Sequence, residues 1–528
     1  MDKIPRLILS VTIILALLTI SIYLYSRGDL LSLLLMGFAG SAAITFLAYL
    51  YYGRFKIPRR IDELLVSLLI HMHVISLGEV GPDDLVKVIA ETKDYGYYSK
   101  VFDRIREVAR KFGYGFTKAT AKIAATTKPP FRDVLVRCEQ IFSSLDPKGY
   151  LELEASTMFE EYSGYYERAI KAMETFGGIY GTFQSVSVFI IMIVVLLVVF
   201  TNNPDVIYYA YAITPLTLIA MLVAFISLVP KEKFTYIDKK DPPAPYRLFR
   251  ASVTLPFACI APAFLIGSYL GPPYGFAVVG VGALIPGLIA YRFERLIYRI
   301  DESYPTLIKS LGESMSSASS LKSALYYVLY MELGPLKKLV KRAYARLVLG
   351  ISNEKVLSLL SSEAASHRVY LINKMFLDAF LYGANPLEAG KILGNSCVKL
   401  LEFRKKRASV AKSIEAVVYI LQPLTVALVV ILGSLSKYFS QSMTSLPFFT
   451  FGQIPVEVIE VGNIFLVICI TIFNSLVLKF ARGGFGGSIF LYIGILLLLS
   501  AMAWIGAEKI MELSFGGIME SFEEIVSI

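Results

Sequence analysis

The residues that most often do chemistry are few in this chain and widely spaced. The nearest approach to a metal-binding pair is His71 and His73, but side chains two residues apart on a helix point away from each other. No cysteine or acidic residue is spaced to act as a third ligand beside them. We therefore expect both histidines on a solvated or interfacial surface. His367 has no nucleophile at the spacing of a catalytic motif.

The glycine-rich string also lacks the features of a nucleotide site. It runs from Gly483 to Gly487 without the lysine and the hydroxyl residue that complete a phosphate-binding loop. We expect a flexible turn between two apolar runs instead. The four cysteines are isolated, so no disulfide framework is indicated. The sequence predicts that the protein is not an enzyme and that it uses neither a cofactor nor a metal ion.

Two clusters of basic residues offer a different chemistry, the binding of acidic groups. The first comprises Lys337, Lys338, Lys341 and Arg342. The second comprises Arg404, Lys405, Lys406 and Arg407. The spacings of three and four residues place the first cluster on one stripe of a helix. A solvated helix face would explain that stripe equally well. A role in membrane topology, or contact with anionic lipid, would explain the second cluster, which precedes an apolar run.

These residues must be positioned by a chain that is largely apolar. Hydrophobic residues make up 55% of it, and its mean hydropathy is +0.61, yet it carries 52 basic and 42 acidic residues. The charges are segregated into blocks, which is typical of a polytopic membrane protein with soluble insertions. Apolar stretches long enough to cross about 30 Å of hydrocarbon predict nine transmembrane helices. They lie at 7–25, 30–52, 179–200, 207–229, 251–270, 274–291, 414–433, 461–479 and 488–506.

The distribution of basic residues predicts the orientation. With a cytoplasmic N-terminus, nine crossings leave only Arg27, Lys437 and Lys509 outside the cell among the 52 basic residues. The acidic C-terminal tail then lies outside as well. The sequence thus predicts a multi-pass protein of the cell (cytoplasmic) membrane with a cytoplasmic N-terminus and an external C-terminus.

Two charged blocks between apolar hairpins recur at an offset of about 237 residues. Ile61-Asp62-Glu63 in the first block falls opposite Ile300-Asp301-Glu302 in the second, and Gly115 falls opposite Gly350. Helical apolar spacing interrupted by glycine and proline predicts five or six short helices in each block. We therefore expect an all-α fold with nine transmembrane helices and two cytoplasmic helical bundles related by internal duplication.

The two blocks differ in charge. The first holds 19 basic and 18 acidic residues, whereas the second holds 20 basic and 10 acidic residues. A block this basic favours an acidic protein partner or anionic lipid, while the lack of interleaved aromatic residues argues against nucleic acid. The predicted segments are a transmembrane hairpin at 1–52, a helical domain at 53–178, a hairpin at 179–229, a cytoplasmic linker at 230–250, a hairpin at 251–291, the basic helical domain at 292–413, a hairpin at 414–480, a ninth transmembrane helix at 488–506 and an external tail at 507–528.

Gln184 and Gln422 are amides near the start of apolar runs at related positions of the two halves. Their ordinary role would be to hold helices together, contributing about 1 kcal/mol each. We hypothesise that they line one polar seam between the two modules. The middle of the predicted spans carries no ionisable residue, which argues against ion coupling.

Several short motifs in the second half match one known family. They are Tyr304-Pro305-Thr306-Leu307-Ile308, Ser319-Ser320-Leu321-Lys322-Ser323-Ala324-Leu325, Gly334-Pro335-Leu336, Gly350-Ile351-Ser352-Asn353 and Leu401-Glu402-Phe403-Arg404-Lys405-Lys406-Arg407. By these motifs the chain resembles the platform proteins of type IV filaments, the type II secretion system F-domain family. Its layout is similar to two Tad-type modules in tandem, as in the archaeal archaellum and pilus platforms.

The resemblance implies a platform that hydrolyses nothing itself. A hexameric secretion ATPase in the cytoplasm would act on the two helical domains, and their movement would lift pilin- or archaellin-like subunits into a filament. The two basic clusters would then form the docking face for the ATPase, and a homodimer is expected. A secondary transporter and a static membrane scaffold are the alternatives. The choice between archaellum, adhesion pilus and DNA-exchange pilus stays open.

Overall fold

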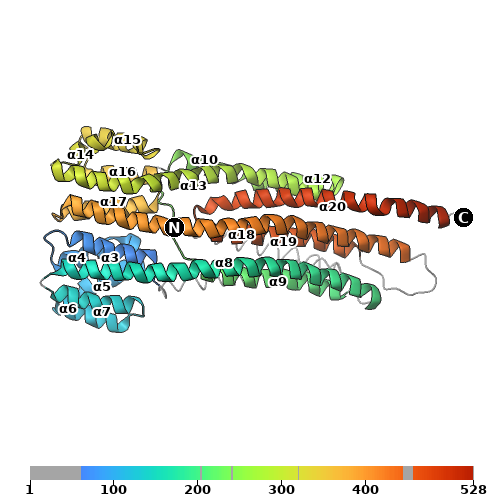
Figure 1. Cartoon of the computed structure of the whole chain (residues 1–528), viewed down its shortest axis with the longest axis horizontal. Coiled ribbons are helices and arrows are strands. Elements are labelled where there is room, and N and C mark those ends of the chain that lie inside the picture. Colours follow the sequence, from blue (N-terminus) through green and yellow to red (C-terminus); the bar gives the residue numbers. More distant parts are fainter. Residues whose placement is uncertain are drawn as a thin grey trace.

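The computed structural model describes residues 61–144, 146–201, 205–238, 242–318, 320–443 and 456–526. The molecule is elongated, with short helices gathered at one end and long helices running side by side toward the other, where the C-terminus lies (Figure 1). Within these ranges there is no strand, only an isolated bridge between Thr235 and Ser366. The all-helical fold is confirmed. The predicted spans at 7–25 and 30–52 lie outside the described residues.

The first helical domain is built around a fully buried helix. Its elements are α3 (Glu63–Ile75), α4 (Pro82–Glu91), η1 (Lys93–Tyr95), α5 (Tyr97–Lys111), α6 (Gly115–Thr126), α7 (Phe131–Ser143) and the start of α8 (Pro147–Thr201). Helix α3 starts where the Asp62 side chain accepts the N–H of Leu65 at 2.9 Å, an N-cap that satisfies a free donor of the first turn. Every residue from Leu65 to Ile75 is buried. A helix that is apolar all round belongs in a core, and α3 packs between α8 and α17.

The second helical domain passes through helices in the same order. They are the end of α13 (Pro272–Ser317), then α14 (Leu321–Val328), α15 (Leu336–Val348), α16 (Asn353–Ala364), α17 (His367–Leu381) and the start of α18 (Pro386–Met443). The 55-residue α8 and the 58-residue α18 each follow four shorter α-helices, α4 to α7 and α14 to α17 respectively.

Three helices connect the domains to the apolar part of the molecule without a break. Helices α8, α13 and α18 run straight through the expected boundaries at 178, 291 and 413. At about 1.5 Å per residue, the 58 residues of α18 span roughly 87 Å. That length is more than twice the roughly 30 Å thickness of the hydrocarbon core of a bilayer. One helix therefore belongs both to a helical domain and to the apolar part.

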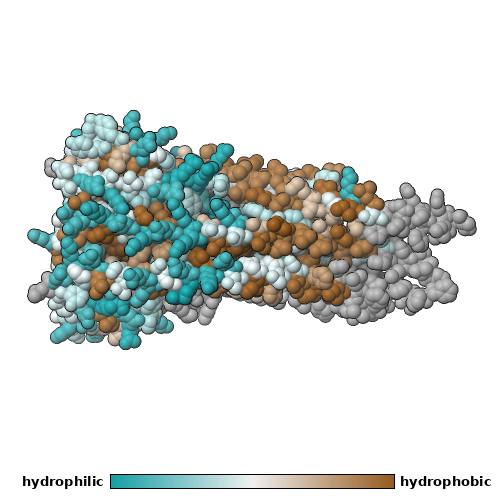
Figure 2. Space-filling model, viewed as in Figure 1, coloured by the Kyte–Doolittle hydropathy of each residue, from teal (hydrophilic) through white to brown (hydrophobic). Residues whose placement is uncertain are grey.

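Five helices in the described ranges are long and apolar enough to cross a membrane. They are Ala244–Leu270, Pro272–Ser317, Pro386–Tyr438, Val456–Arg482 and Gly486–Ser514. These comprise α10 (Ala244–Ser252), α11 (Leu255–Ala258), α12 (Ile260–Leu270), α13, α18, α19 (Val456–Arg482), η2 (Gly486–Ser488) and most of α20 (Ile489–Val526). The predicted spans at 179–200 and 207–229 fall in α8 and α9 (Asp205–Leu228). We call the end that holds the short helices of the two domains the head, and the bundle of long helices beyond it the shaft. Figure 2 shows that the head is largely hydrophilic and the shaft hydrophobic.

Helix α18 is central to the shaft and packs against α8, α13, α19 and α20. Close backbone approach between α13 and α20 depends on small residues. A Cβ atom built on Gly287 would lie 2.4 Å from the backbone nitrogen of Leu491. A small residue such as glycine at a helix–helix contact lets the backbones of two membrane helices approach each other closely.

Candidate functional site

The basic stripe lies exposed on α15. Its residues are Lys337, Lys338, Lys341 and Arg342, and all four are exposed. The opposite face of the helix packs into the core through Leu339 and Val340. In the part of the chain that the structure describes, the three lysines form no ion pair, while Arg342 Nη1 lies 3.7 Å from Glu363 Oε2. The structure therefore brings the four residues together on one open surface.

The second basic cluster is divided between the surface and the interior. Lys405 and Lys406 are exposed on α18, and their ammonium groups lie 3.6 Å from Glu302 and 2.7 Å from Glu167, respectively. Arg404 and Arg407 are only 4% and 3% exposed. Because the two guanidinium groups are enclosed by the protein, they present no charge to a partner in this structure.

Arg407 instead closes the end of α19. Its Nη2 and Nε donate to the carbonyls of Phe480 and Ala481 at 2.7 and 2.9 Å, and its Nη1 donates to the carbonyl of Pro230 at 3.0 Å. The last carbonyls of a helix lack intrahelical partners and carry partial negative charge, so a guanidinium is well suited to cap them. A Cβ on Gly483 would lie 2.8 Å from the Arg407 guanidinium carbon, which requires glycine there.

The loop that follows is the predicted flexible turn, and it is held by a carboxylate. Glu294 Oε2 accepts the N–H of Phe485 at 3.1 Å and also the hydroxyl of Ser488. Gly484 adopts φ of +69°, and a Cβ there would lie 2.5 Å from Glu294 Oε1. The backbone of this glycine-rich loop thus binds an anion that the chain itself supplies.

Arg404 belongs to a buried group of charges that we call the junction cluster. Its members are Glu63, Glu232, Asp301, Arg368 and Arg404. Arg404 binds Asp301 and Glu232, and its Nε donates to Glu232 Oε1 at 2.8 Å. Arg368 Nη2 donates to Glu63 Oε1 at 3.0 Å and lies 3.3 Å from Glu232 Oε1. The members come from both helical domains and from the linker after α9, so the cluster joins all three.

Three carboxyl groups share two guanidinium groups in this cluster. Burial alone would raise the pKa of Glu232, but Arg404 and Arg368 beside it lower the value to about 2. Burial raises the pKa of Glu63, and Arg368 offsets this only in part. Glu63 therefore takes up a proton more readily than Glu232. Truncating one partner of a buried ion pair typically lowers the free energy of unfolding by about 3–5 kcal/mol. Loss of one member of the cluster should therefore destabilise the contact between the domains.

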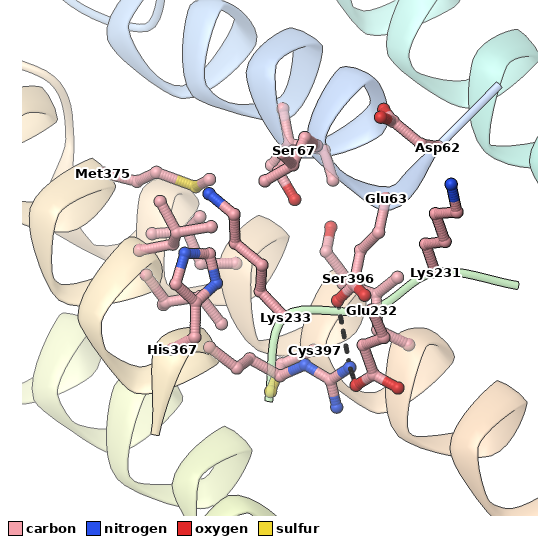
Figure 3. Close-up of a pocket in the computed structure, with 17 residues that line it drawn as sticks. Asp62, Glu63, Ser67, Lys231, Glu232, Lys233, His367, Met375, Ser396 and Cys397 are labelled. Atoms are coloured by element: carbon pink, nitrogen blue, oxygen red, sulfur yellow. Dashed lines mark hydrogen bonds and ion pairs between the residues drawn. The ribbon is translucent and has the colours of Figure 1, made fainter. Parts of the chain in front are cut away.

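A cavity of about 200 Å³ lies beside the junction cluster (Figure 3). Figure 3 shows Glu63 on α3 and Glu232 on the linker turned toward the same point, with His367 and Lys233 on the other side. Arg368 Nε and Nη1 and His367 Nε2 are buried without a protein hydrogen-bond partner. A cavity of this size can admit water to such groups. The cavity therefore gives the buried charges a route to hydration and to protons.

His71 also joins the two helical domains. Its Nε2 lies 3.1 Å from Asp378 Oδ2 on α17, and its Nδ1 lies 3.1 Å from the hydroxyl of Tyr95. The prediction of solvated histidines is wrong, because His71 and His73 are 0% and 6% exposed, whereas His71 does lie at the interface between the two domains. Burial lowers the pKa of His71, and the hydrogen bond with Asp378 opposes this shift.

The linker is fastened to both domains beyond the junction cluster. The ring of Tyr236 stacks on Tyr370 of α17 at 3.9 Å between centroids. Lys233 Nζ donates to the carbonyl of Asp94 at 3.0 Å, and the Tyr370 hydroxyl donates to the Asp94 carboxylate at 2.8 Å. Movement of one domain against the other must break these contacts as well as the junction cluster.

The two glutamines of the hypothesised seam lie at the same helix crossing in the shaft. Gln422 on α18 donates to Thr471 Oγ1 at 2.7 Å and to Ser500 Oγ at 3.0 Å, and it accepts from Asn474 Nδ2 at 2.8 Å. It therefore bonds to both α19 and α20. Gln184 is bonded more weakly. Its Nε2 donates to Thr425 Oγ1 on α18 at 3.3 Å.

The two amides do not touch each other, but α8 and α18 connect them. Thr425 lies one turn along α18 from Gln422. The hydroxyl of Tyr180, one turn before Gln184 on α8, donates to Asn474 Oδ1 at 2.8 Å. Tyr180, Gln184 and Gln422 are each at most 1% exposed. The result is a chain of buried polar contacts across α8, α18, α19 and α20.

The junction cluster is the feature that sequence reasoning missed. Glu232 bonds with residues 136 and 172 positions away, and no local pattern encodes those partners. The available signal was Glu232 standing between Lys231 and Lys233 in a basic linker, together with the repeated Ile-Asp-Glu motif, whose Glu63 and Asp301 both enter the cluster.

With this geometry in view, we compared the chain with known proteins. No family model and no solved structure matches it. The chain is similar to flagella accessory protein J. It is 23% identical over 446 residues to the protein of that name from Methanocaldococcus jannaschii. The aligned region covers 80% of this chain and 77% of the relative. It is 23% identical over 414 residues to the one from Methanococcus voltae, which covers 74% and 72%.

These relatives are named for an accessory role in flagella rather than for a catalysed reaction. The protein is not an enzyme. The similarity extends over most of the chain, so it is not confined to one helical domain.

Proposed function

We propose that the protein is the integral membrane platform of an archaellum-type filament machine. In this role it couples a cytoplasmic hexameric secretion ATPase to the insertion of pilin- or archaellin-like subunits. The similarity to proteins named flagella accessory protein J supports the assignment to archaellum assembly. Five apolar helices of spanning length support its place in the cell membrane.

The observation that carries the proposal is the continuity of α8, α13 and α18 between head and shaft (Figure 1). A helix is stiff over such lengths, so displacement of the head moves the apolar part of the same helix. The junction cluster and the linker contacts hold the heads of these helices in one arrangement. A force that breaks those contacts would change the shaft, as a platform requires.

We further propose nine crossings with a cytoplasmic N-terminus and an external C-terminus, and an origin by internal duplication. The shared order of helices supports the duplication, since α4 to α8 and α14 to α18 follow each other with similar lengths. The hydrophilic head is the part that we place in the cytoplasm (Figure 2). In this topology both helical domains face the ATPase.

The docking face is proposed on the α15 stripe, with Lys405 and Lys406 as its flank. The exposure of these six cations supports the assignment, whereas the buried Arg404 and Arg407 act within the protein. Surface cations steer an acidic partner over distances of about a Debye length, and within the described residues the three lysines of the stripe form no ion pair. A homodimer is compatible with this arrangement and is not required by it.

A secondary transporter is less well supported. The buried polar contacts of Gln184, Gln422 and their neighbours are amides and hydroxyls, which do not change charge. Coupled transport across a membrane normally uses ionisable groups in the spans. We propose that these contacts form the seam along which the two modules pack.

Reconstitution tests the function directly. The full chain would be placed in liposomes, and ATP hydrolysis by the purified secretion ATPase of the same host would be measured with and without it. The platform function predicts stimulation of hydrolysis, with loss of stimulation at high salt. An ATPase that binds the liposomes but is not stimulated would indicate a static scaffold, and no binding at all would contradict motor coupling.

A further inference from the structure

The two helical domains carry large apolar side chains at equivalent exposed positions. Phe112 follows the last residue of α5, and Leu349 follows the last residue of α15. The two residues are separated by the repeat offset of about 237 positions. Phe112 is 68% exposed and Leu349 is 79% exposed. Each precedes a glycine in the left-handed region, Gly113 with φ of +65° and Gly350 with φ of +79°.

These positions lie at the end of the head that is farthest from the shaft. Helices α8 and α18 both begin at this end and run toward the shaft (Figure 1). Helices α5 and α15 lead into the distal turns, because the chain reverses direction at Gly113 and at Gly350 before α6 and α16. Figure 2 shows that the head is largely hydrophilic and that the hydrophobic surface lies along the shaft. The exposure of Phe112 and Leu349 therefore needs a different explanation from that of the apolar shaft.

The distal ends of the two domains touch each other. The loop after α3 and the loop after α17 touch so closely that a Cβ on Gly78 would lie 2.1 Å from the carbonyl oxygen of Tyr382. In the first domain the ring of Tyr114 lies 6.5 Å from that of Phe112, and Lys122 Nζ lies 4.7 Å from the Tyr114 centroid. An aromatic anchor packed beside a neighbouring ring in this way loses less entropy on binding.

We propose that Phe112 and Leu349 are paired anchors for a homo-oligomeric cytoplasmic protein that offers the same apolar pocket more than once. Two equivalent exposed side chains on domains that touch each other fit a partner whose subunits repeat one site. Engaging both side chains raises the affinity beyond that of either alone. The inference rests on the proposed function for the partner's class, since a hexameric secretion ATPase is an oligomer of this kind. It concerns a surface distinct from the α15 stripe.

Photocrosslinking in host membranes tests the inference. The photoreactive residue p-benzoylphenylalanine would replace Phe112 in one variant and Leu349 in another, each in the full chain. Matched controls carry it at Val136 or Val398, which are 45% and 37% exposed on α7 and α18. The expected result is a crosslink to the same protein from positions 112 and 349 and little from the controls, with that protein purifying as a homo-oligomer.

The possible outcomes separate the inference from the proposed function. Crosslinks to two different proteins, to a second copy of this chain, or to none from either position would overturn the inference. A shared homo-oligomer that is not an ATPase would leave the paired anchors standing and would contradict only their link to the proposed ATPase. ATPase stimulation in liposomes without crosslinks would leave the function standing and overturn the inference.

Affinity measurements with the protein identified in this way give a second readout. Phe112→Ser and Leu349→Ser should each weaken binding roughly tenfold, and the double variant roughly a hundredfold. Val136→Ser should change it less than about twofold, and all four variants should unfold at nearly the wild-type temperature, because the side chains are exposed. Binding by the double variant within twofold of wild type would refute the paired anchors.

Discussion

Helices α5 and α15 occupy the same place in the two helical domains and differ in their charges. Both bury one face and both end before a left-handed glycine. On α5, three basic residues pair with acidic ones, namely Arg106 with Glu91, Arg110 with Asp83 and Lys111 with Glu107. Helix α15 carries five basic residues and no acidic one. The buried face thus follows the requirement of the fold, while only α15 presents an exposed face without acidic residues of its own.

The helices that enter the shaft show the same contrast. Glu167 on α8 falls opposite Arg404 on α18 in the repeat. Glu167 is exposed and pairs with Lys406, whereas Arg404 is buried in the junction cluster. One position thus serves the surface in the first module and the domain junction in the second. We expect the two modules to respond differently to changes at such positions.

The largest effect is expected at this position. Arg404→Ala should lower the free energy of unfolding by about 3–5 kcal/mol, because it leaves Asp301 and Glu232 buried without their partner. Glu167→Ala at the equivalent position should change it by less than about 0.5 kcal/mol. Thermal unfolding in detergent micelles would measure both. Equal effects would show that the junction cluster does not distinguish the modules.

The pH dependence of stability should reveal Glu232. Its pKa falls from an ordinary value of 4.5 to about 2 in the folded protein. A carboxyl group with a depressed pKa stabilises the fold above its unfolded value and loses that contribution as the pH falls toward its folded value. The contribution is on the order of 3 kcal/mol. Wild-type unfolding temperatures should therefore drop between about pH 5 and pH 2.

Glu232→Gln should flatten that drop and lower stability at pH 7. The matched control is Glu302→Gln, which removes an exposed carboxylate that pairs with Lys405 at 3.6 Å. The control should keep the wild-type pH profile, since an exposed pair contributes little. A Glu232→Gln profile that follows wild type throughout would contradict the role of this carboxylate in the junction cluster.

A smaller difference is expected between the two glutamines of the seam. Gln422→Leu removes the hydrogen bonds of this side chain with Asn474, Thr471 and Ser500. It should lower the free energy of unfolding by about 1–2 kcal/mol. Gln184→Leu removes one long hydrogen bond and should cost less than about 1 kcal/mol. Unfolding in micelles measures the cost, and filament assembly in the host measures the function. Normal assembly by the double variant would refute the seam hypothesis.

The smallest effect is expected from the flank of the docking face. Lys405→Ala with Lys406→Ala should weaken ATPase binding by less than about threefold, because both ammonium groups already have acidic neighbours. A salt titration of binding would measure the change. A loss as large as that from the α15 stripe would place the docking face on α18 instead.

The sequence predicts the surface of this molecule better than its interior charges. Helical spacing correctly placed Lys337, Lys338, Lys341 and Arg342 on one exposed stripe, because the position of a side chain around a helix follows from local spacing alone. The second basic cluster, Arg404 to Arg407, consists of two exposed and two buried residues. Local pattern cannot show that division, since the partners Asp301 and Glu232 are 103 and 172 positions away.

The interior roles of His71 and Glu294 could not be predicted for the same reason. His71 bonds with Asp378 in the other domain, and Glu294 fills a glycine-rich loop 191 residues further along the chain. A histidine or a glycine-rich loop looks identical in sequence whether its partner is a ligand or the chain itself. Only the tertiary arrangement separates the two cases.

The basic stripe of α15 is the central feature of the proposed docking of the secretion ATPase. Its direct test is the affinity of the purified secretion ATPase for the full chain in liposomes, with Lys337, Lys338 and Lys341 changed together to Glu. The matched control changes Lys100 and Arg104 to Glu at the equivalent positions of α5. We predict a loss of binding of about a hundredfold or more for the α15 variant, and less than about threefold for the control. Equal affinities for wild type and the α15 variant would contradict the account.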